Sequence, residues 1–302
     1  MELRVIEYFL AVAREQSIMA AADYLNITQP TLSRQLKDLE EELGKQLFTR
    51  GKRNKKITLT EEGRLFRKRA QEIIDLTEKT KNEISHSEKT ISGDIYIGAG
   101  ETDTMRHIVE IVHEIRNSYP DFHLHIVSGD SIDLEARLDA GLFDFCLLLG
   151  DINQSKYEYL NLPWIDTWGV LMHKDAPLAV KECIEPKDLC DKPLIFSRAV
   201  LSRTNYFRWL EKPVSGLNIV ATYNLAYNAS VMAKAKLGYV LVLDKLINTT
   251  GDSDLCFRPL SPSLTLGMSL VWKKYQVFSK AAEYFLEQLQ KRISINNTTK
   301  PD

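Results

Sequence analysis

The feature that most constrains the fold is a pair of amphipathic helices joined by only three residues near the N-terminus. The first of the pair is predicted from Ile18 to about Leu25, and Ser17 is suited to cap it. The second starts after residues 26–28 and ends near Gly44, a residue type that often follows a helix in the left-handed conformation. Its apolar face carries Leu32, Leu36, Leu39 and Leu43. A three-residue connection of this kind is typical of a helix-turn-helix.

Another helix is predicted over residues 2–14, so this helix is the third of the chain. Its opposite face is polar. It carries Gln29, Ser33, Arg34 and Lys37. Amide, hydroxyl and guanidinium groups are the ones that recognise base edges in the major groove. Most amphipathic surface helices have no partner, and that alternative stays open from this pattern alone. The position directly after the turn favours DNA recognition.

A basic turn follows between two apolar segments, Leu47-Phe48 and Ile57–Leu59. Residues 45–69 hold ten basic residues and two acidic ones. We expect a short hairpin, a wing, with its cations around the turn of residues 49–56. Long cationic side chains on such a turn suit contact with phosphates, which adds affinity without sequence information. A charge run by itself is equally compatible with a solvated face.

A long polar helix is predicted from Thr60, a suitable N-cap, to about Ser87. It carries an incomplete apolar strip through Leu65, Ile73, Leu76 and Ile84. The strip is too long for one small domain to cover, and the simplest cover is the same helix of a second chain. The alternative is that the helix lies on the C-terminal domain of its own chain.

From Ile95 to Leu149 short apolar strands alternate with helices, which predicts parallel strand-helix-strand units. Ligands in such sheets bind outside the carboxyl ends of the strands. Those ends are the stretches 100–104 and 128–131, and a second lobe over about residues 165–264 offers Ser197-Arg198 and Tyr223-Asn224 after its strands. The chain then returns to the first lobe through a strand, 268–272, and a last helix, 279–292.

Many spaced residues of the first 65 positions resemble the LysR-type transcriptional regulators, and the match has no gap. Later segments, such as residues 139–144 and 237–241, resemble the same family. The N-terminal positions that carry the resemblance are Phe9–Ala13, Ser17, Ala21-Ala22, Leu25, Gln29-Pro30, Ser33, Leu36, Leu39-Glu40, Leu43-Gly44, Leu47-Phe48, Arg50, Leu59-Thr60 and Gly63.

The resemblance implies an α/β protein with an N-terminal all-α winged helix-turn-helix, a long linker helix and a two-lobed effector domain like a periplasmic binding protein. The expected divisions are 1–59 for DNA binding, 60–90 for the dimerisation helix and 91–302 for the effector domain. Lobe I would comprise 91–164 and 265–295, and lobe II would comprise 165–264. Expected partners are double-stranded DNA, a small-molecule effector held between the lobes, and a second copy in a homodimer or homotetramer.

Two sets of site residues follow from the motifs and the resemblance. The expected DNA-binding residues are Gln29, Pro30, Thr31, Ser33, Arg34 and Lys37 on the third helix, with Arg50 and Arg53 on the backbone of the DNA. The expected effector-binding residues are Thr102, Ser128, Ser197 and Tyr223. Each of these four could instead be a turn or cap residue. Arg198 could hold a carboxylate or be an ordinary surface arginine, and Glu101 would repel an anion or hold a cation.

Signals for other chemistry are weak. His123 and His125 share a strand face as metal ligands sometimes do, but no third ligand has a matching spacing, so a simple strand is favoured. Cys183 and Cys190 could form a redox pair, although free thiols are the simpler interpretation. There is no nucleophile motif and no phosphate loop. We expect neither catalysis, nor a metal, nor a cofactor.

The composition indicates the class of protein, and the N-terminus indicates its location. Hydrophobic residues make up 44% and charged residues 26% of the 302 residues, as in ordinary globular proteins. No apolar run reaches about 18 residues, and the N-terminus lacks a signal-peptide pattern, so a cytoplasmic protein is expected. The competing hypotheses are a two-lobed solute-binding protein or enzyme with an N-terminal helical extension, and a structural dimeric adaptor.

Overall fold

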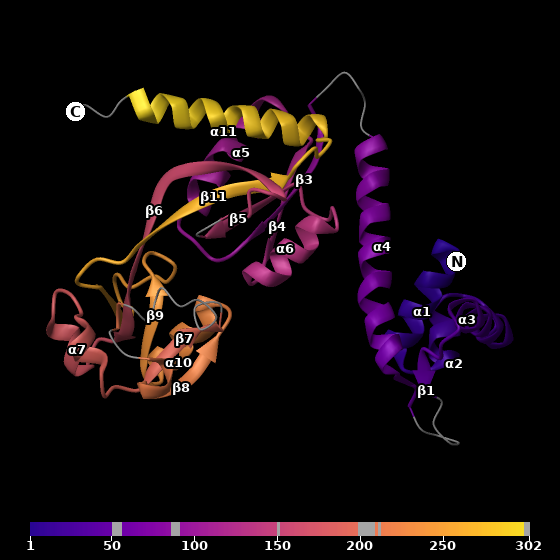
Figure 1. The fold of residues 1–302 in the computed structure, drawn as a ribbon, viewed down its shortest axis with the longest axis horizontal. Helices are drawn as coiled ribbons and strands as arrows, with labels where there is room; N and C mark the ends of the chain where they lie inside the picture. Colours follow the sequence, from indigo (N-terminus) through magenta and orange to yellow (C-terminus); the bar gives the residue numbers. More distant parts are fainter. Residues whose placement is uncertain (50–55, 86–90, 150–151, 199–208, 211–212, 299–302) are drawn as a thin grey trace. The chain divides into compact units, whose positions relative to one another are not determined.

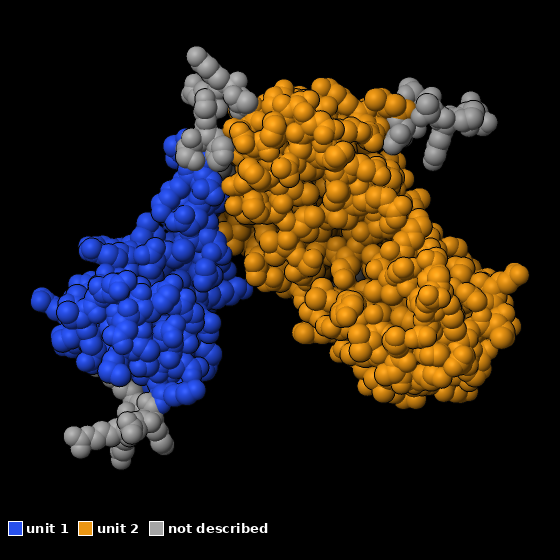
Figure 2. Space-filling view, turned by 180° about the vertical axis from the view of Figure 1, so that it is seen from behind, with its two compact units in different colours: residues 1–85 blue, residues 86–302 orange. Residues whose placement is uncertain are grey.

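The computed structural model describes residues 1–49, 56–85, 91–149, 152–198, 209–210 and 213–298. The chain forms two compact units, residues 1–85 and residues 86–302, which Figure 2 colours separately. Each unit has hydrophobic cores of its own, built from side chains that are almost fully buried.

Unit 1 begins with three packed helices, α1 (Leu3–Glu15), α2 (Ile18–Tyr24) and α3 (Gln29–Leu43). Two of the helix caps that the sequence predicts are present. The Ser17 Oγ accepts the N–H of Ala20 at 3.3 Å, and Gly44 follows α3 with a φ of 64°. The predicted helix-turn-helix is therefore confirmed. The core beneath it consists mainly of apolar residues of these helices, among them Ile6, Phe9, Val12, Ala21, Leu32, Leu36 and Leu39.

The wing is a short antiparallel pair, β1 (Phe48–Thr49) and β2 (Thr58–Leu59), with Phe48 opposite Leu59. Phe48 is buried against the ring of Phe9, at a centroid distance of 5.0 Å, which fixes the base of the wing to the helical core. The tip, residues 50–55, lies outside the described residues, and so do the expected DNA contacts of Arg50 and Arg53.

The long helix α4 (Glu61–Ser85) begins at a side-chain cap, because the Thr60 Oγ1 accepts the N–H of Gly63 at 2.9 Å. The predicted apolar strip divides into two parts. Ile73 packs half-buried on the core of unit 1, beside the buried Ala70. Three strip residues remain open, with exposed fractions of 63% for Leu65, 40% for Leu76 and 79% for Ile84.

Unit 2 is built on one nine-stranded sheet in which eight strands follow the order β4-β3-β5-β11-β6-β9-β7-β8 and β10 pairs with β6. Strands β3, β4 and β5 are mutually parallel, as predicted, while β11 joins β5 and β6 antiparallel. The strands are β3 (Gly93–Ala99), β4 (Phe122–Ser128), β5 (Phe145–Leu149), β6 (Tyr157–His173), β7 (Leu194–Ser197), β8 (Ile219–Tyr223), β9 (Tyr239–Leu243), β10 (Leu255–Pro259) and β11 (Thr265–Lys273).

The 17-residue strand β6 divides the sheet into two lobes, as Figure 1 shows. Its first part, residues 157–167, pairs with β11 in lobe I. Its second part, residues 168–173, pairs with β9 and β10 in lobe II. The sheet therefore passes from one lobe to the other without a break, and Figure 2 shows unit 2 as two masses with a narrower waist.

Helices cover both faces of the sheet in each lobe, so each lobe has three layers. In lobe I, α5 (Met105–Ser118) and α11 (Lys280–Thr298) share one core, while α6 (Ser131–Asp139) packs in another. In lobe II, the short helices η1 (Pro177–Val180) and α7 (Pro186–Leu189) lie over one core and α10 (Ala226–Lys234) over the other. A further short turn of helix, η2, spans Val214–Gly216. In the described part of the chain, no helix is both long and apolar enough to cross a membrane.

A substitution at Gly63 tests how α4 is anchored to the wing. A Cβ there would lie 2.0 Å from the carbonyl oxygen of Leu47, which is backbone and cannot turn away. Gly63→Ala should destabilise unit 1 by about 1–3 kcal/mol through this overpacking. All four tryptophans lie in unit 2, so the loss should appear in circular dichroism and not in tryptophan fluorescence during urea unfolding.

The matched control is Gly267→Ala in β11, where a Cβ meets nothing within 4 Å. This variant should unfold as the wild type does by both signals. Wild-type stability of Gly63→Ala would show that α4 is not held against the wing in this way.

Candidate functional site

The polar face of α3 is open in the structure. Gln29, Pro30, Thr31, Arg34 and Lys37 are exposed, and Ser33 is half-buried. The opposite face is closed, because Leu32, Leu36 and Leu39 are at most 2% exposed. The helix thus presents the residues predicted for DNA on one side while its leucines fix it to unit 1.

The cations of this face have only weak intrahelical partners. Arg34, which is 83% exposed, lies 3.9 Å from Asp38, and Lys37 lies 3.2 Å from Glu41. Exposed pairs four residues apart contribute only about 0.3–0.5 kcal/mol and are screened by salt. The guanidinium and the ammonium group can therefore exchange these partners for a base edge or a phosphate at little cost.

A cavity of about 110 Å³ lies between the two lobes of unit 2. Three of the four residues predicted to bind an effector line it, namely Ser128 of lobe I and Ser197 and Tyr223 of lobe II. Glu101 and Arg198, the two charged residues singled out in the sequence, line it as well. Thr102 is not among the lining residues, although it directly follows Glu101.

The hydroxyl groups of Thr102 and Tyr223 already have protein partners. Thr102 is 6% exposed and its Oγ1 donates to the carboxylate of Asp166. The Tyr223 hydroxyl donates to the carbonyl of Leu241 at 2.7 Å, and burial raises the pKa of this phenol. Tyr223 therefore contributes its ring to the cavity, whereas Ser128 is exposed and Ser197 half-buried.

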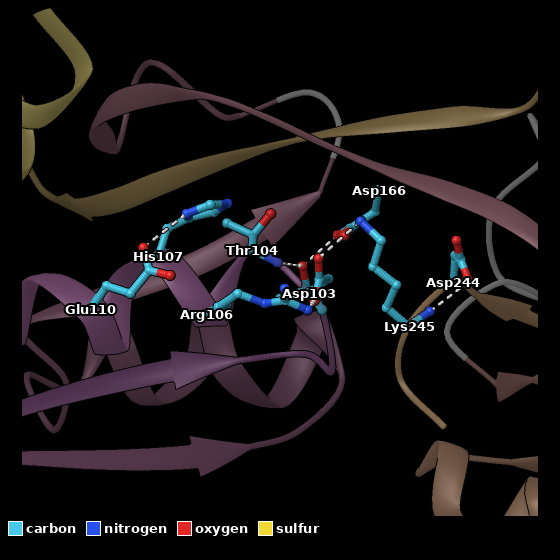
Figure 3. Close-up of polar contacts among 9 residues, drawn as sticks. Asp103, Thr104, Arg106, His107, Glu110, Asp166, Asp244 and Lys245 are labelled. Atoms are coloured by element: carbon cyan, nitrogen blue, oxygen red, sulfur yellow. Dashed lines mark hydrogen bonds and ion pairs between the residues drawn. The ribbon is translucent and has the colours of Figure 1, made fainter. Parts of the chain in front are cut away.

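Three consecutive residues after β3 contact lobe II or the crossing strand β6. The Glu101 carboxylate accepts the N–H of Ala226, the first residue of α10 in lobe II. Thr102 donates to Asp166 on the crossing strand β6. The carboxylate of Asp103 lies 3.3 Å from the Lys245 Nζ of lobe II and 2.6 Å from Arg106 of its own lobe. Figure 3 shows these residues.

Asp166 is the buried member of this cluster and was not predicted from the sequence. It is 4% exposed, and burial raises its pKa above the usual 3.8, although hydrogen bonds from the Thr102 hydroxyl and the Asp103 N–H act in the opposite direction. Its only sequence signal is a single acidic residue in the mainly apolar stretch 164–168. No sequence pattern pointed to Lys245, because it lies 142 residues from its partner Asp103.

The remaining candidates from the sequence are two histidines for a metal site and two cysteines for a redox pair. On the edge strand β4, the Nδ1 of His123 and the Nε2 of His125 lie 3.6 Å and 3.2 Å from the same oxygen of Asp94. In the described ranges, no three His, Cys, Asp or Glu side chains are grouped so that they could hold a metal ion. Cys183 and Cys190 are free thiols, the first exposed and the second half-buried.

Comparison with protein families covers both units. Residues 3–64 match the family described as "Bacterial regulatory helix-turn-helix protein, lysR family", and residues 88–294 match the "LysR substrate binding domain". The chain belongs to the LysR family. This LysR family member thus has the two parts that its sequence resemblance implied, and the family comprises transcriptional regulators.

Similar proteins are found among bacterial regulators. The HTH-type transcriptional regulator YtlI of Bacillus subtilis is 32% identical over 199 residues, which are 66% of this chain and 63% of YtlI. The chain therefore spans less than two thirds of this relative. YybE of Bacillus subtilis, an uncharacterised HTH-type regulator, is 27% identical over 97% of this chain and its own full length.

Among solved structures, the LysR family transcriptional regulator CbnR superposes on this LysR family member with a TM-score of 0.75. The superposition covers 97% of this chain and 99% of CbnR, at 18% sequence identity. A second structure of full-length CbnR, in complex with its target DNA, gives a TM-score of 0.74. At this identity the similarity establishes the fold.

The buried charge of Asp166 predicts a pH dependence of stability. Since its pKa is raised in the folded protein, the folded state binds more protons than the unfolded state in the pH range above 3.8. The unfolding free energy of unit 2 should therefore fall as the pH rises through this range. Asp166→Asn keeps an acceptor for Thr102 and should remove this pH dependence. As the pH rises, the wild type should therefore lose stability relative to this variant.

Tryptophan fluorescence during urea unfolding, repeated at pH values from 4 upward, measures this difference. Asp121→Asn, which changes an exposed aspartate before β4, serves as the control and should follow the wild type. A constant difference between wild type and Asp166→Asn across the series would contradict the raised pKa.

Proposed function

We propose that this protein is a sequence-specific DNA-binding transcriptional regulator controlled by a small molecule held between its two lobes. The observation that carries the proposal is the polar face of α3, which is exposed except at the half-buried Ser33, while Leu32, Leu36 and Leu39 behind it are buried. An exposed helix of this composition directly after a tight turn is suited to the major groove. Gln29, Pro30, Thr31, Ser33, Arg34 and Lys37 are the proposed contacts, with Arg50 and Arg53 on phosphates.

The relatives support the same function. YtlI is a transcriptional regulator, and CbnR, which has the same fold, has been solved with its target DNA. The division of roles that we propose is DNA binding by residues 1–59, dimerisation by 60–90 and effector binding by 91–302. Catalysis has no part in the proposed function, and the protein would act in the cytoplasm, where its DNA is.

The cavity between the lobes is the proposed effector site. Its lining comes from the strand ends and helix N-termini of both lobes, where small ligands of α/β proteins bind. A ligand that contacts both lobes stabilises one arrangement of the lobes over others and shifts the population towards it. Ser128, Ser197 and Tyr223 are proposed contacts, and Thr102 would act through Asp166 because its hydroxyl is engaged there.

The open strip of α4 supports assembly into a homodimer or homotetramer. Leu65, Leu76 and Ile84 are exposed apolar residues on one helix, and such a strip is covered when two copies of the helix pair. A two-fold symmetric dimer would then match an inverted-repeat DNA site.

Base recognition by α3 is tested with Arg34→Ala. A DNA site selected by the wild-type protein from a random pool supplies the specific target. The variant should lose about 1–3 kcal/mol of binding free energy on that site and much less on random DNA, since a base contact contributes only where the base is correct. Fluorescence anisotropy of both DNAs in the same salt measures the two losses.

Arg116→Ala is the matched control, since Arg116 is an exposed arginine of α5 in the other unit, and it should bind both DNAs as the wild type does. Equal losses of Arg34→Ala on both DNAs would make Arg34 a phosphate contact. The absence of any selected site would contradict the proposed function.

Pairing through α4 is tested with Leu76→Glu. A charge placed in a dry helix interface costs several kcal/mol, so this variant should sediment as a smaller species than the wild type. Gln71→Glu adds the same charge about 140° around the helix and should keep the wild-type mass. A wild type that is itself monomeric in analytical ultracentrifugation would refute the pairing.

A further inference from the structure

Two carboxylates and one guanidinium line the cavity between the lobes. Glu101 and Asp130 belong to lobe I, and Arg198 follows β7 in lobe II. None of the three forms an ion pair with another described residue, although they line the same cavity. Charges of opposite sign thus stand on opposite lobes, and the protein itself does not bring them together.

The described residues supply only part of the hydrogen bonds that the two carboxylates can accept. Glu101 is half-buried and accepts the N–H of Ala226 through Oε2, while its Oε1 accepts no hydrogen bond from a described residue. Asp130 is the N-cap of α6 and accepts the N–H of Asp133 through Oδ1 at 3.0 Å. Backbone N–H groups orient both carboxylates but leave their charge unpaired, so a cationic group of a ligand would be stabilised beside them.

Arg198 offers the complementary group. A guanidinium binds a carboxylate through two parallel hydrogen bonds, which fixes the orientation of the bound molecule. Among the described residues, no carboxylate forms an ion pair with Arg198. The half-buried Ser197, next to it in the chain, adds a hydroxyl to the same side of the cavity.

The rest of the cavity is lined mainly by apolar residues. Leu148, Trp168, Val242, Leu246 and Met268 line it from both lobes. Since about 10–15 Å³ of such space holds one water-sized group, the cavity of about 110 Å³ has room for roughly 7–11 non-hydrogen atoms. A ligand that fills it is therefore small, with an apolar part that meets this lining and charged groups that meet the carboxylates and the guanidinium.

We propose that the cavity binds an apolar α-amino acid, of about the size of leucine, as its zwitterion. Its ammonium group pairs with Glu101 and Asp130, its carboxylate pairs with Arg198, and its side chain occupies the aliphatic part. A simple carboxylic acid would leave the charges of Glu101 and Asp130 unpaired, and a simple amine would leave Arg198 unpaired. The proposal rests on the proposed function, because it names the chemical class of the effector of that same site.

Calorimetric titration of the full-length protein tests the ligand class. Leucine, valine and phenylalanine are each compared with two analogues of the same side chain, one without the amino group and one without the carboxylate. For leucine these are 4-methylpentanoate and 3-methylbutylamine. At least one amino acid should bind, and both of its analogues should bind about tenfold more weakly or worse, since each leaves a charged group of the site unpaired.

The proposal is overturned if none of the three amino acids binds at millimolar concentration, or if either analogue binds as tightly as its parent. Because Glu101 also contacts lobe II, the variants retain hydrogen-bonding capacity. Arg198→Gln should bind the amino acid and its decarboxylated analogue alike. Glu101→Gln with Asp130→Asn should bind the amino acid and its deaminated analogue alike, and Glu110→Gln on α5, outside the cavity, should discriminate as the wild type does.

DNA binding separates failure of this proposal from failure of the proposed function. Selection of a specific DNA site by the protein, together with no amino-acid binding, overturns the ligand class alone. Amino-acid binding with the expected discrimination, in a protein that selects no DNA site, supports the ligand class and contradicts the proposed regulation.

Discussion

The antiparallel pairing of β6 with its neighbours holds unit 2 together. One continuous strand of 17 residues pairs with β11 up to Thr167 and with β9 from Trp168 onward. The backbone of β6 therefore belongs to both lobes, and a change in the angle between the lobes has to bend or twist the sheet near this point. The buried hydrogen bond between Thr102 and Asp166 lies one residue before it, where it joins lobe I to the crossing strand.

The cavity is a consequence of this arrangement. Strands β3 and β4 end in lobe I, and β7 and β8 end in lobe II, at loops that line the same space. The loop after β3 has contacts to lobe II on both sides of Thr102, through Glu101 to Ala226 and through Asp103 to Lys245. A ligand held here would act on the contacts that join the lobes, as the control site that we propose requires.

The sequence predicted the elements whose signals are local. The helices of unit 1, the caps at Ser17 and Thr60 and the alternation of strands and helices in lobe I follow from periodicity and from residue types at helix ends. The continuity of β6 and the strand β10 were not predicted, because they depend on pairings between distant segments. The helix α10 was not predicted either. Local patterns also could not show that the hydroxyls of Thr102 and Tyr223 are engaged by Asp166, 64 residues away, and by Leu241.

In the regulation that we propose, occupancy of the cavity and binding of DNA are coupled. Linkage requires that a ligand which changes DNA affinity by some factor has its own affinity changed by DNA by the same factor. The decisive measurement is therefore the affinity of the full-length protein for its selected DNA site, with and without the tightest-binding amino acid, together with the affinity for that amino acid with and without saturating DNA. Such coupling predicts equal factors of about 5 to 150 in the two titrations. A ligand that saturates the cavity and leaves DNA affinity unchanged would contradict it.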